Sequence, residues 1–316
     1  MQSFLVTGGA GFIGSHLVEK LVAEGHQVSV LDNFNEFYDP DIKRANLAAV
    51  VDRITLIDGD ITDRPLVDRI FAEGNFDTVV HLAARAGVRP SIDNPEAYIT
   101  TNINGTYYLL EASRQHGVKH FVFSSSSSVY GLNEKMPFSE DDRIDQTISP
   151  YAATKLAGEQ LCSNFAHLYA MRVVCLRFFT VYGPRQRPDL AISKFTRLIS
   201  NDEPIERYGD GKTARDYTYV EDIVQGVMGA IGYRQKNFDI FNLGGSQTVT
   251  LNELIESVEE ALGKKATIIE KPEQPGDVPK TWADVSKAER LLDYHPDTPI
   301  RQGVPKYVEW FLGAPV

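Results

Sequence analysis

Short apolar runs alternate with longer amphipathic segments through the first 180 residues of the chain. Runs typical of strands lie at 4–6, 28–31, 54–57, 78–81, 121–123 and 173–178. Apolar residues recur at helical spacing in 13–23, 95–116 and 149–168. Because strands that alternate with helices form βαβ units, this pattern predicts an α/β fold with a doubly wound parallel sheet, the Rossmann fold.

The pattern becomes less regular beyond about residue 180, where proline and glycine interrupt it. Helical spacing returns at 220–231, 251–262 and 286–292, and Thr250 with Glu253 forms a capping-box pattern before the second of these. An apolar run at 240–243 predicts one more strand. We therefore predict a large domain over 1–178, to which 216–245 returns, and a smaller C-terminal α/β lobe over 179–316.

A glycine-rich turn joins the first predicted strand to the first predicted helix. Gly8, Gly11 and Gly14 permit a tight turn and let the backbone approach a pyrophosphate, which the amides at the helix N-terminus then face. Asp32 ends the second strand, where a carboxylate accepts the ribose 2′-hydroxyl and repels a 2′-phosphate. This context favours NAD over NADP. It also favours a dinucleotide-binding turn over a flavodoxin-like turn, which binds no dinucleotide.

The ends of the next two predicted strands also carry candidate cofactor contacts. Asp60 and Ile61 follow the third strand and either contact the adenine or form only a polar strand end. The small residues after Leu82, Ala83 and Ala84, would leave room for the cofactor. We interpret His81 as a hydrogen-bonded structural residue and not as a catalyst.

Tyr151 and Lys155 are candidates for catalysis, because a spacing of four near the start of a helix places both on one face. They follow the strand that ends in serines 124–128, at the sheet edge where ligands bind. A phenol titrates near 10, and a lysine ammonium with a positive nicotinamide would favour the phenolate. Tyr151 would then be a general base on a substrate hydroxyl that Ser126 also binds, and Lys155 would hold the nicotinamide ribose. A polar loop is the alternative for the serines.

Composition narrows the classes of partner. The net charge of −11 argues against binding of nucleic acid or of an anionic membrane surface. No apolar run reaches the roughly 18 residues of a membrane helix, and no leader precedes the first strand. Two cysteines, Cys162 and Cys175, form neither a disulfide framework nor a metal-ligand pattern, so we predict a cytoplasmic protein without a metal site.

These motifs give the chain a resemblance to the extended short-chain dehydrogenase/reductase superfamily, in particular to the NAD-dependent epimerase/dehydratase group. The resemblance covers the whole chain and rests on the glycine turn, the serine run before Val129, Tyr151 with Lys155, and the segment 177–184. It implies an NAD that is reduced and reoxidised within each turnover, and a homodimer whose interface is four helices from 95–116 and 149–168. The expected cofactor contacts are Gly8, Gly11, Phe12, Ile13, Gly14, Asp32, Asn33, Asp60, Ile61, Leu82, Ala83, Ala84, Asn102, Ser124, Tyr151 and Lys155.

Within this group, several segments are similar to UDP-glucuronate 4-epimerases. Dehydratases carry an acidic pair where this chain has Ser127 and Ser128, and UDP-glucose 4-epimerases usually carry asparagine where it has Thr180. The resemblance implies interconversion of UDP-glucuronate and UDP-galacturonate through a 4-keto sugar. A UDP-glucuronate decarboxylase, a UDP-glucose 4-epimerase and a non-catalytic NAD-binding regulator remain as alternatives.

An anionic UDP-sugar requires local positive charge in an acidic protein. Arginine suits bidentate recognition of carboxylates and phosphates, and Arg85, Arg89, Arg185, Arg187, Lys194 and Arg215 fall in loops predicted near the pocket. We assign Arg185 to the sugar carboxylate, beside Thr180, Ser127 and Ser128. The full set of expected substrate contacts is Arg89, Ser126, Ser127, Ser128, Thr180, Arg185, Ala191, Ser193, Lys194, Tyr208, Arg215, Gln274 and Asp277.

Overall fold

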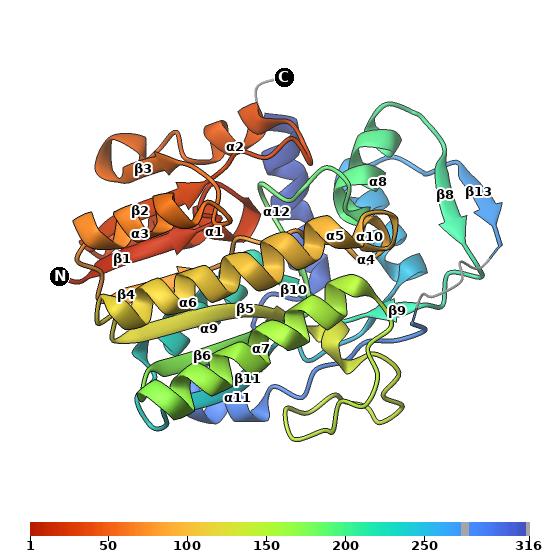
Figure 1. The fold of residues 1–316 in the computed structure, drawn as a ribbon. Helices are drawn as coiled ribbons and strands as arrows, with labels where there is room; N and C mark the ends of the chain where they lie inside the picture. Colours follow the sequence, from red (N-terminus) through yellow and green to blue (C-terminus); the bar gives the residue numbers. More distant parts are fainter. Residues whose placement is uncertain (273–277, 314–316) are drawn as a thin grey trace.

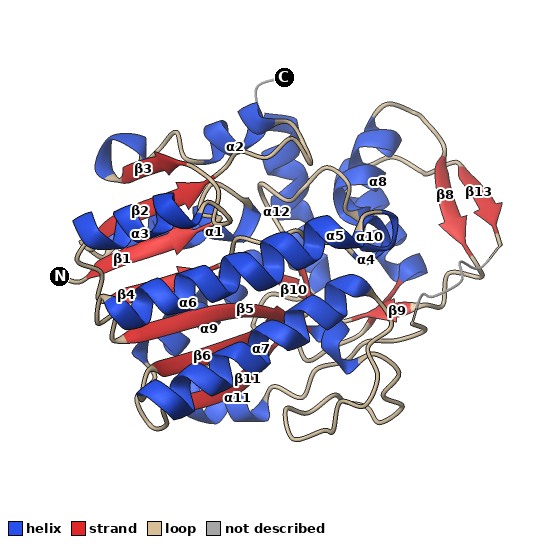
Figure 2. Cartoon of the chain, viewed as in Figure 1, coloured by secondary structure: helices blue, strands red, loops and turns tan. Residues whose placement is uncertain are grey.

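The computed structural model describes residues 1–272 and 278–313, and its centre is a seven-stranded sheet (Figures 1 and 2). The strand order is β11-β6-β5-β4-β1-β2-β3, and all neighbours in this sheet are parallel. The strands are β1 (Ser3–Thr7), β2 (Gln27–Asp32), β3 (Thr55–Asp58), β4 (Thr78–His81), β5 (His120–Ser126), β6 (Arg172–Phe178) and β11 (Phe238–Leu243). The predicted doubly wound α/β fold is confirmed.

Helices cover both faces of this sheet and bury a separate core on each. On one face α1 (Phe12–Ala23), α9 (Val220–Gly232) and α11 (Ser286–Leu292) contribute to the larger core. On the other face lie α3 (Arg64–Glu73), α6 (Thr106–Gln115) and α7 (Pro150–Tyr169), which run across the front of the sheet in Figure 1. Because both faces are covered, the central strands are apolar on both sides, which explains their continuous apolar runs.

The predicted helix over 95–116 consists of three parts. A short helix α5 (Pro95–Tyr98) continues into a π-helical segment (Ile99–Gly105) and then into α6. The apolar spacing does not distinguish one wide turn inside a helix, which is why the sequence predicts a single element. Such wide turns occur frequently at functional sites, and this one passes beside the cavity described below.

The helix starts agree with the capping signals in the sequence. Ser149 caps α7 by accepting a hydrogen bond from the Ala152 amide at 3.1 Å, with proline in the first turn. Thr250 and Glu253 form the predicted capping box at the start of α10 (Leu251–Leu262). Each of these caps supplies partners for amides that the first helical turn leaves unpaired.

A second, smaller unit is built on a third core. It contains α8 (Ala191–Ser200), α10 and α12 (Ile300–Gly313), together with buried aromatic residues such as Tyr182 and Tyr307. Three two-stranded sheets belong to this half of the chain: β7 (Thr180–Tyr182) with β10 (Tyr217–Tyr219), β8 (Ile205–Tyr208) with β13 (Ile268–Lys271), and β9 (Ala214–Arg215) with β12 (Val249–Thr250). Strands of two or three residues leave no period in the sequence, and β8 and β13 each carry two charged residues among four, so the apolar pattern predicts none of these six strands.

The chain re-enters the large sheet after leaving it. Strand β11 lies at its edge beside β6, and α9 contributes to the core beneath. The residues around α11, including Ala283, Val285 and Tyr294, also belong to that core, although the predicted boundary placed them with the C-terminal lobe. The division into domains stays a prediction. No helix in the described ranges is long and apolar enough to cross a membrane.

Candidate active site

A cavity of about 540 Å³ opens at the carboxyl ends of β1, β2, β4 and β5, where the strand order reverses. This switch point is where ligands bind in open α/β sheets. Nearly all of the predicted cofactor residues line it: Gly8, Gly11, Phe12, Ile13, Gly14, Asp32, Asn33, Asp60, Ile61, Leu82, Ala83, Ala84, Ser124, Tyr151 and Lys155. The fold thus brings together residues that are up to 147 positions apart in the chain.

The glycine turn has no room for side chains. A Cβ on Gly8, whose φ is +70°, would lie 2.6 Å from the Ala83 amide nitrogen, and one on Gly14 would lie 2.2 Å from the Gly8 carbonyl oxygen. Gly11 is the N-cap residue of α1, and it has no side chain that could accept hydrogen bonds from the amides of the first turn. Amides of the first turn are therefore available to an anion, and the turn fits a pyrophosphate.

Two carboxylates stand at the ends of β2 and β3. Asp32 is buried and accepts hydrogen bonds from the Ala10 amide at 3.1 Å and the Phe34 amide at 3.0 Å, while its burial raises its pKa. Asp60 accepts from Asn33 Nδ2 at 2.7 Å, and hydrogen bonds from Thr62 and Asn33 outweigh its burial and lower its pKa. An acceptor at the Asp32 position suits the hydroxyls of an adenosine ribose and disfavours a 2′-phosphate. The adenine contact of Asp60 stays a prediction.

The predicted catalytic residues meet inside the same cavity. Tyr151 lies in the first turn of α7, and its phenol hydrogen-bonds Ser126 at the end of β5. Lys155, one turn later, donates to the Ser124 carbonyl at 2.7 Å. Tyr98 packs edge-on against the Tyr151 ring, with 6.2 Å between centroids. The arrangement places a phenol, a hydroxyl and an ammonium around one region of the cavity.

The pKa shifts of this group differ from the sequence-based expectation in one respect. Burial raises the pKa of Tyr151, and the opposing influences are the Ser126 hydrogen bond and the positive charge of Arg187, not Lys155 as expected. Burial lowers the pKa of Lys155 to about 7, against the influence of Cys162 and Glu159. Within the chain alone Tyr151 is therefore a neutral phenol, which needs additional positive charge before it becomes a base.

His81 is structural, as the sequence predicted. Its Nδ1 lies 2.7 Å from Thr7 Oγ1 and its Nε2 lies 2.9 Å from Thr106 Oγ1, so both ring nitrogens have partners inside the core. Burial lowers its pKa to about 3. A neutral imidazole of this kind ties β4 to β1 and α6.

Asn102 does not line the cavity, although it was expected to contact the cofactor. Its Oδ1 accepts from the Arg85 amide at 2.8 Å, and its Nδ2 donates to the Arg85 carbonyl and to Thr154 Oγ1, each at 3.0 Å. The amide thus fastens the loop after β4 to α7 beside Lys155. Its observed contacts position these two walls of the cavity.

A second cavity of about 220 Å³ adjoins the first, and Val88, Ser127, Ser128 and Thr180 line both. Arg89, from α4 (Val88–Asp93), and Arg215, from β9, line only the second cavity. The predicted substrate residues Arg89, Ser126, Ser127, Ser128, Thr180 and Arg215 therefore lie around two connected spaces next to Tyr151.

Arg185 does not occupy the position that binding of a sugar carboxylate would require. Its Nη2 donates to Glu19 of α1 at 2.6 Å, its φ is +65°, and it lines neither cavity. Arg187 lines the main cavity instead, 5.3 Å above the Phe37 ring, and binds Asp189 through Nε at 2.9 Å and Nη2 at 2.8 Å. Arg187 thus replaces Arg185 as the candidate for the sugar carboxylate.

The remaining predicted substrate contacts lie away from both cavities or outside the described residues. Ala191, Ser193 and Lys194 belong to α8, where Ser193 hydrogen-bonds Tyr307, and Tyr208 donates to Glu206 at 3.0 Å. None of these four lines a described cavity, although the preceding Leu190 does. Gln274 and Asp277 lie outside the described residues. Their roles stay predictions.

Several residues near β2 that line the main cavity are not identified by the sequence pattern. Tyr38 and Lys43 line the main cavity, and Lys43 donates to the Asn35 carbonyl at 2.8 Å from α2 (Pro40–Asn46). One local signal is the Asp39–Pro40 helix start, since Asp39 caps α2 and proline occupies its first turn. That signal locates the helix but not the direction of its side chains.

A doubly wound sheet with a glycine cradle, acidic strand ends and a buried tyrosine–lysine–serine group defines a dinucleotide-dependent enzyme. The family model described as GDP-mannose 4,6 dehydratase matches residues 5–307. The chain belongs to this family of NAD-dependent epimerases and dehydratases, which confirms the predicted family and cofactor.

Named relatives are similar over nearly the whole chain. UDP-glucuronate 4-epimerase 1 of Arabidopsis thaliana is 44% identical over 329 residues, covering 98% of this chain and 76% of that protein. The Bacillus cereus UDP-glucuronic acid 4-epimerase, solved with UDP-glucuronic acid and NAD, has a TM-score of 0.91 and 36% identity, covering 98% and 99% of the two chains. The Thermotoga maritima UDP-glucose 4-epimerase, solved with UDP-glucose, has the same score and identity over 98% of each chain.

Proposed function

We propose that this protein is a UDP-glucuronate 4-epimerase, which interconverts UDP-glucuronate and UDP-galacturonate. The chain is an NAD-dependent UDP-sugar 4-epimerase by its family and relatives, and the proposal concerns the sugar. The observation that carries it is the set of hydroxyls shared by the two cavities, Ser127, Ser128 and Thr180, with Arg187 in the same space. Hydroxyl donors and a guanidinium suit a carboxylate, whereas a neutral hydroxymethyl group needs no such charge.

The chain's own residues fit NAD at the switch point. The glycine cradle would hold the pyrophosphate, Asp32 the adenosine ribose, and Lys155 the nicotinamide ribose. When bound, NAD supplies a hydride acceptor for C4 and a positive charge close to Tyr151. Lys155 at a pKa of about 7 is itself only partly charged near neutral pH.

Tyr151 and Ser126 would handle the proton of the 4-hydroxyl. Tyr151 as the phenolate would accept the O4 proton as the sugar is oxidised at C4, and would become a neutral phenol. Ser126, hydrogen-bonded to Tyr151, holds the same oxygen in line. After the 4-keto sugar turns over, Tyr151 would return the proton to O4 as the sugar is reduced, so the phenolate is restored for the next turnover.

The carboxylate contacts would also decide the product. A 4-keto uronic acid is a β-keto acid, which loses carbon dioxide when its carboxylate bond aligns with the carbonyl π system. Arg187 and the hydroxyls of Ser127 and Thr180 would hold the carboxylate out of that alignment and keep its charge paired. Weak contacts here would turn the epimerase into a decarboxylase.

One incubation tests the proposal. Purified protein is mixed with UDP-glucuronate without added NAD, and the sugar protons are followed by NMR. We expect UDP-galacturonate to accumulate to equilibrium. UDP-xylose or a 4-keto pentose would favour the decarboxylase, and turnover of UDP-glucose but not UDP-glucuronate would favour the neutral-sugar epimerase. Thr180→Asn should lower turnover of UDP-glucuronate more than that of UDP-glucose.

The homodimer is a further part of the proposal. Ile99 and Tyr107 on the 95–116 helical run and Leu168 and Tyr169 at the end of α7 are exposed apolar side chains on the helices expected at the interface. Light scattering of the purified protein should give twice the 35.2 kDa chain mass. Tyr107→Glu should shift it towards the monomer if these helices pair. The cytoplasmic location stays a prediction, which cell fractionation would test.

A further inference from the structure

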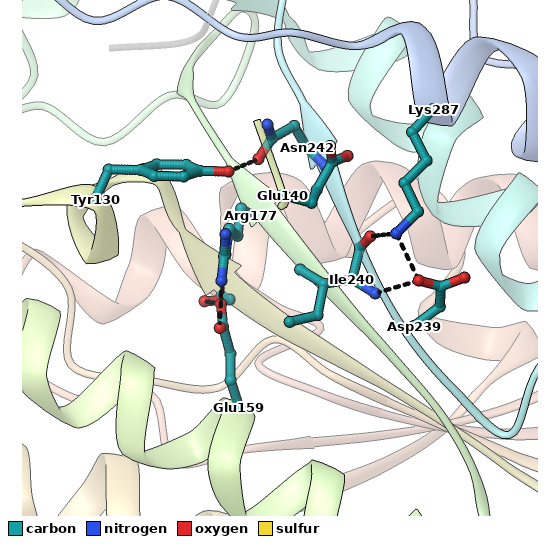
Figure 3. Close-up of polar contacts among 9 residues, drawn as sticks. Tyr130, Glu140, Glu159, Arg177, Asp239, Ile240, Asn242 and Lys287 are labelled. Atoms are coloured by element: carbon teal, nitrogen blue, oxygen red, sulfur yellow. Dashed lines mark hydrogen bonds and ion pairs between the residues drawn. The ribbon is translucent and has the colours of Figure 1, made fainter. Parts of the chain in front are cut away.

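A buried ion pair lies directly behind the catalytic group. Glu159 of α7 and Arg177 of β6 are 1% and 3% exposed, and two hydrogen bonds join them, Nε to Oε1 at 2.9 Å and Nη2 to Oε2 at 2.8 Å (Figure 3). Ser125 donates to the same Oε1 at 2.5 Å. This serine stands between Ser124, which binds Lys155, and Ser126, which binds Tyr151.

The pair is anchored on its far side as well. The Arg177 guanidinium lies 4.8 Å from the centre of the Tyr130 ring, and the Tyr130 hydroxyl donates to Asn242 Oδ1 of β11 at 2.7 Å (Figure 3). Asn242 Nδ2 in turn donates to the Phe138 carbonyl at 2.9 Å. These contacts connect α7, β5, β6 and β11. Removal of either Glu159 or Arg177 would leave a buried charge unpaired.

We propose that Glu159 is a positioning residue for catalysis: clamped by Arg177 and Ser125, it holds the serine strand against the helix that carries Tyr151 and Lys155. Glu159 lies one turn after Lys155 on the same helix, so a single side chain ties the helix to the strand between its two catalytic contacts. The inference rests on the proposed function, because it takes Tyr151 and Lys155 as the catalytic pair.

The charge of Glu159 has a second effect, on Lys155. Burial lowers the pKa of Lys155, and the side chains of Cys162 and Glu159 oppose this shift. A carboxyl group, unlike a thiol, is ordinarily ionised at pH 7. The charged or titratable groups that act on Lys155 are Cys162 and Glu159 on α7, and His81 on β4 also interacts with it. Two groups on β6 contact these in turn, Cys175 on Cys162 and Arg177 on Glu159. Removing the carboxylate would lower the Lys155 pKa further, so less ammonium would remain at neutral pH.

The test compares Glu159→Gln with a matched control. Asp239→Asn breaks a second, partly buried pair, in which Lys287 of α11 donates to Asp239 of β11 at 2.5 Å (Figure 3). Strand β6 separates β11 from the serine strand β5 in the sheet. We expect Glu159→Gln to lower kcat roughly tenfold to hundredfold, in keeping with the cost of a small misplacement, while KM changes by less than about threefold. We expect Asp239→Asn to keep the wild-type kcat per folded molecule.

Two further readouts separate positioning from simple loss of structure. The alkaline limb of the kcat–pH profile should move to lower pH in Glu159→Gln, and ¹⁵N NMR of the Lys155 ammonium should report a lower titration midpoint. Asp239→Asn should change neither. Ser125→Ala, which keeps both charges, should lower kcat a few-fold without moving the Lys155 titration.

Each outcome decides the proposal. A folded Glu159→Gln protein with wild-type kcat and Lys155 titration would overturn it, and so would an equal kcat loss in Asp239→Asn. If Glu159→Gln does not fold, Ser125→Ala decides, and an unchanged kcat there rejects the positioning role. Absence of UDP-sugar turnover in the wild-type protein would instead reject the proposed function, while the NMR titration would still test Glu159.

Discussion

Arg187→Met should selectively weaken binding of a sugar carboxylate. The guanidinium lines the main cavity with an 18% exposed side chain, so a charged hydrogen bond there is only partly screened by solvent. Loss of such a bond costs about 1.5–3 kcal/mol, which corresponds to a rise in KM for UDP-glucuronate of roughly 10- to 150-fold. Asp189, its ion-pair partner, is 47% exposed and would be hydrated after the change, so stability should fall little.

The matched control is Arg185→Met, two residues earlier. Arg185 pairs with Glu19 outside both cavities, so its loss should leave KM nearly unchanged and cost at most about 1 kcal/mol of folding stability. Steady-state kinetics with UDP-glucuronate and UDP-glucose measure both variants. Arg187 also lowers the pKa of Tyr151, so its removal should move the acidic limb of the rate profile to higher pH. The reasoning fails if Arg185→Met raises KM as much as Arg187→Met, or if Arg187→Met affects both sugars equally.

Three other changes have outcomes that the structure specifies. Gly14→Ala should abolish retention of NAD, measured by absorbance of the released cofactor, because its Cβ would lie 2.2 Å from the Gly8 carbonyl; copurified NAD at the wild-type level would contradict the cradle. Tyr151→Phe should lower kcat by about 10²–10⁴ while NAD stays bound, and a smaller loss in stopped assays would remove Tyr151 as the base. His81→Gln should flatten the acid dependence of stability in urea unfolding. The folded-state pKa of His81, about 3, lies below its ordinary value of 6.5, so its contribution is complete above pH 6.5 and declines as pH falls towards 3. An acid limb that persists in the variant would assign it to other groups.

Most of the sheet and the cofactor half of the site could be predicted from the sequence. The strand at 78–81 and the helices at 251–262 and 286–292 agree with the structure to the residue, because buried strands and capped helices carry their signals locally. The glycine turn is equally local, since steric exclusion by the Gly8 carbonyl requires glycine at position 14 whatever else the chain does.

Other features depend on contacts that the sequence does not display. The strands β7, β9 and β10 have two or three residues, too few for a period, and two of the four residues of β8 are charged. The π-helical segment keeps helical spacing. The neutral Tyr151 follows from burial on all sides, which no local pattern reports.

The choice between Arg185 and Arg187 shows this division most clearly. The residue pattern is enough to predict a positive loop after Thr180, and to predict that the glycine turn, Tyr151 and Lys155 meet at one edge of a sheet. Which arginine enters the cavity depends on a long-range contact, because Glu19 of α1, 166 residues earlier in the chain, binds Arg185. Side-chain direction in a loop follows the long-range partners that happen to lie beside it, and these exist only once the chain has folded.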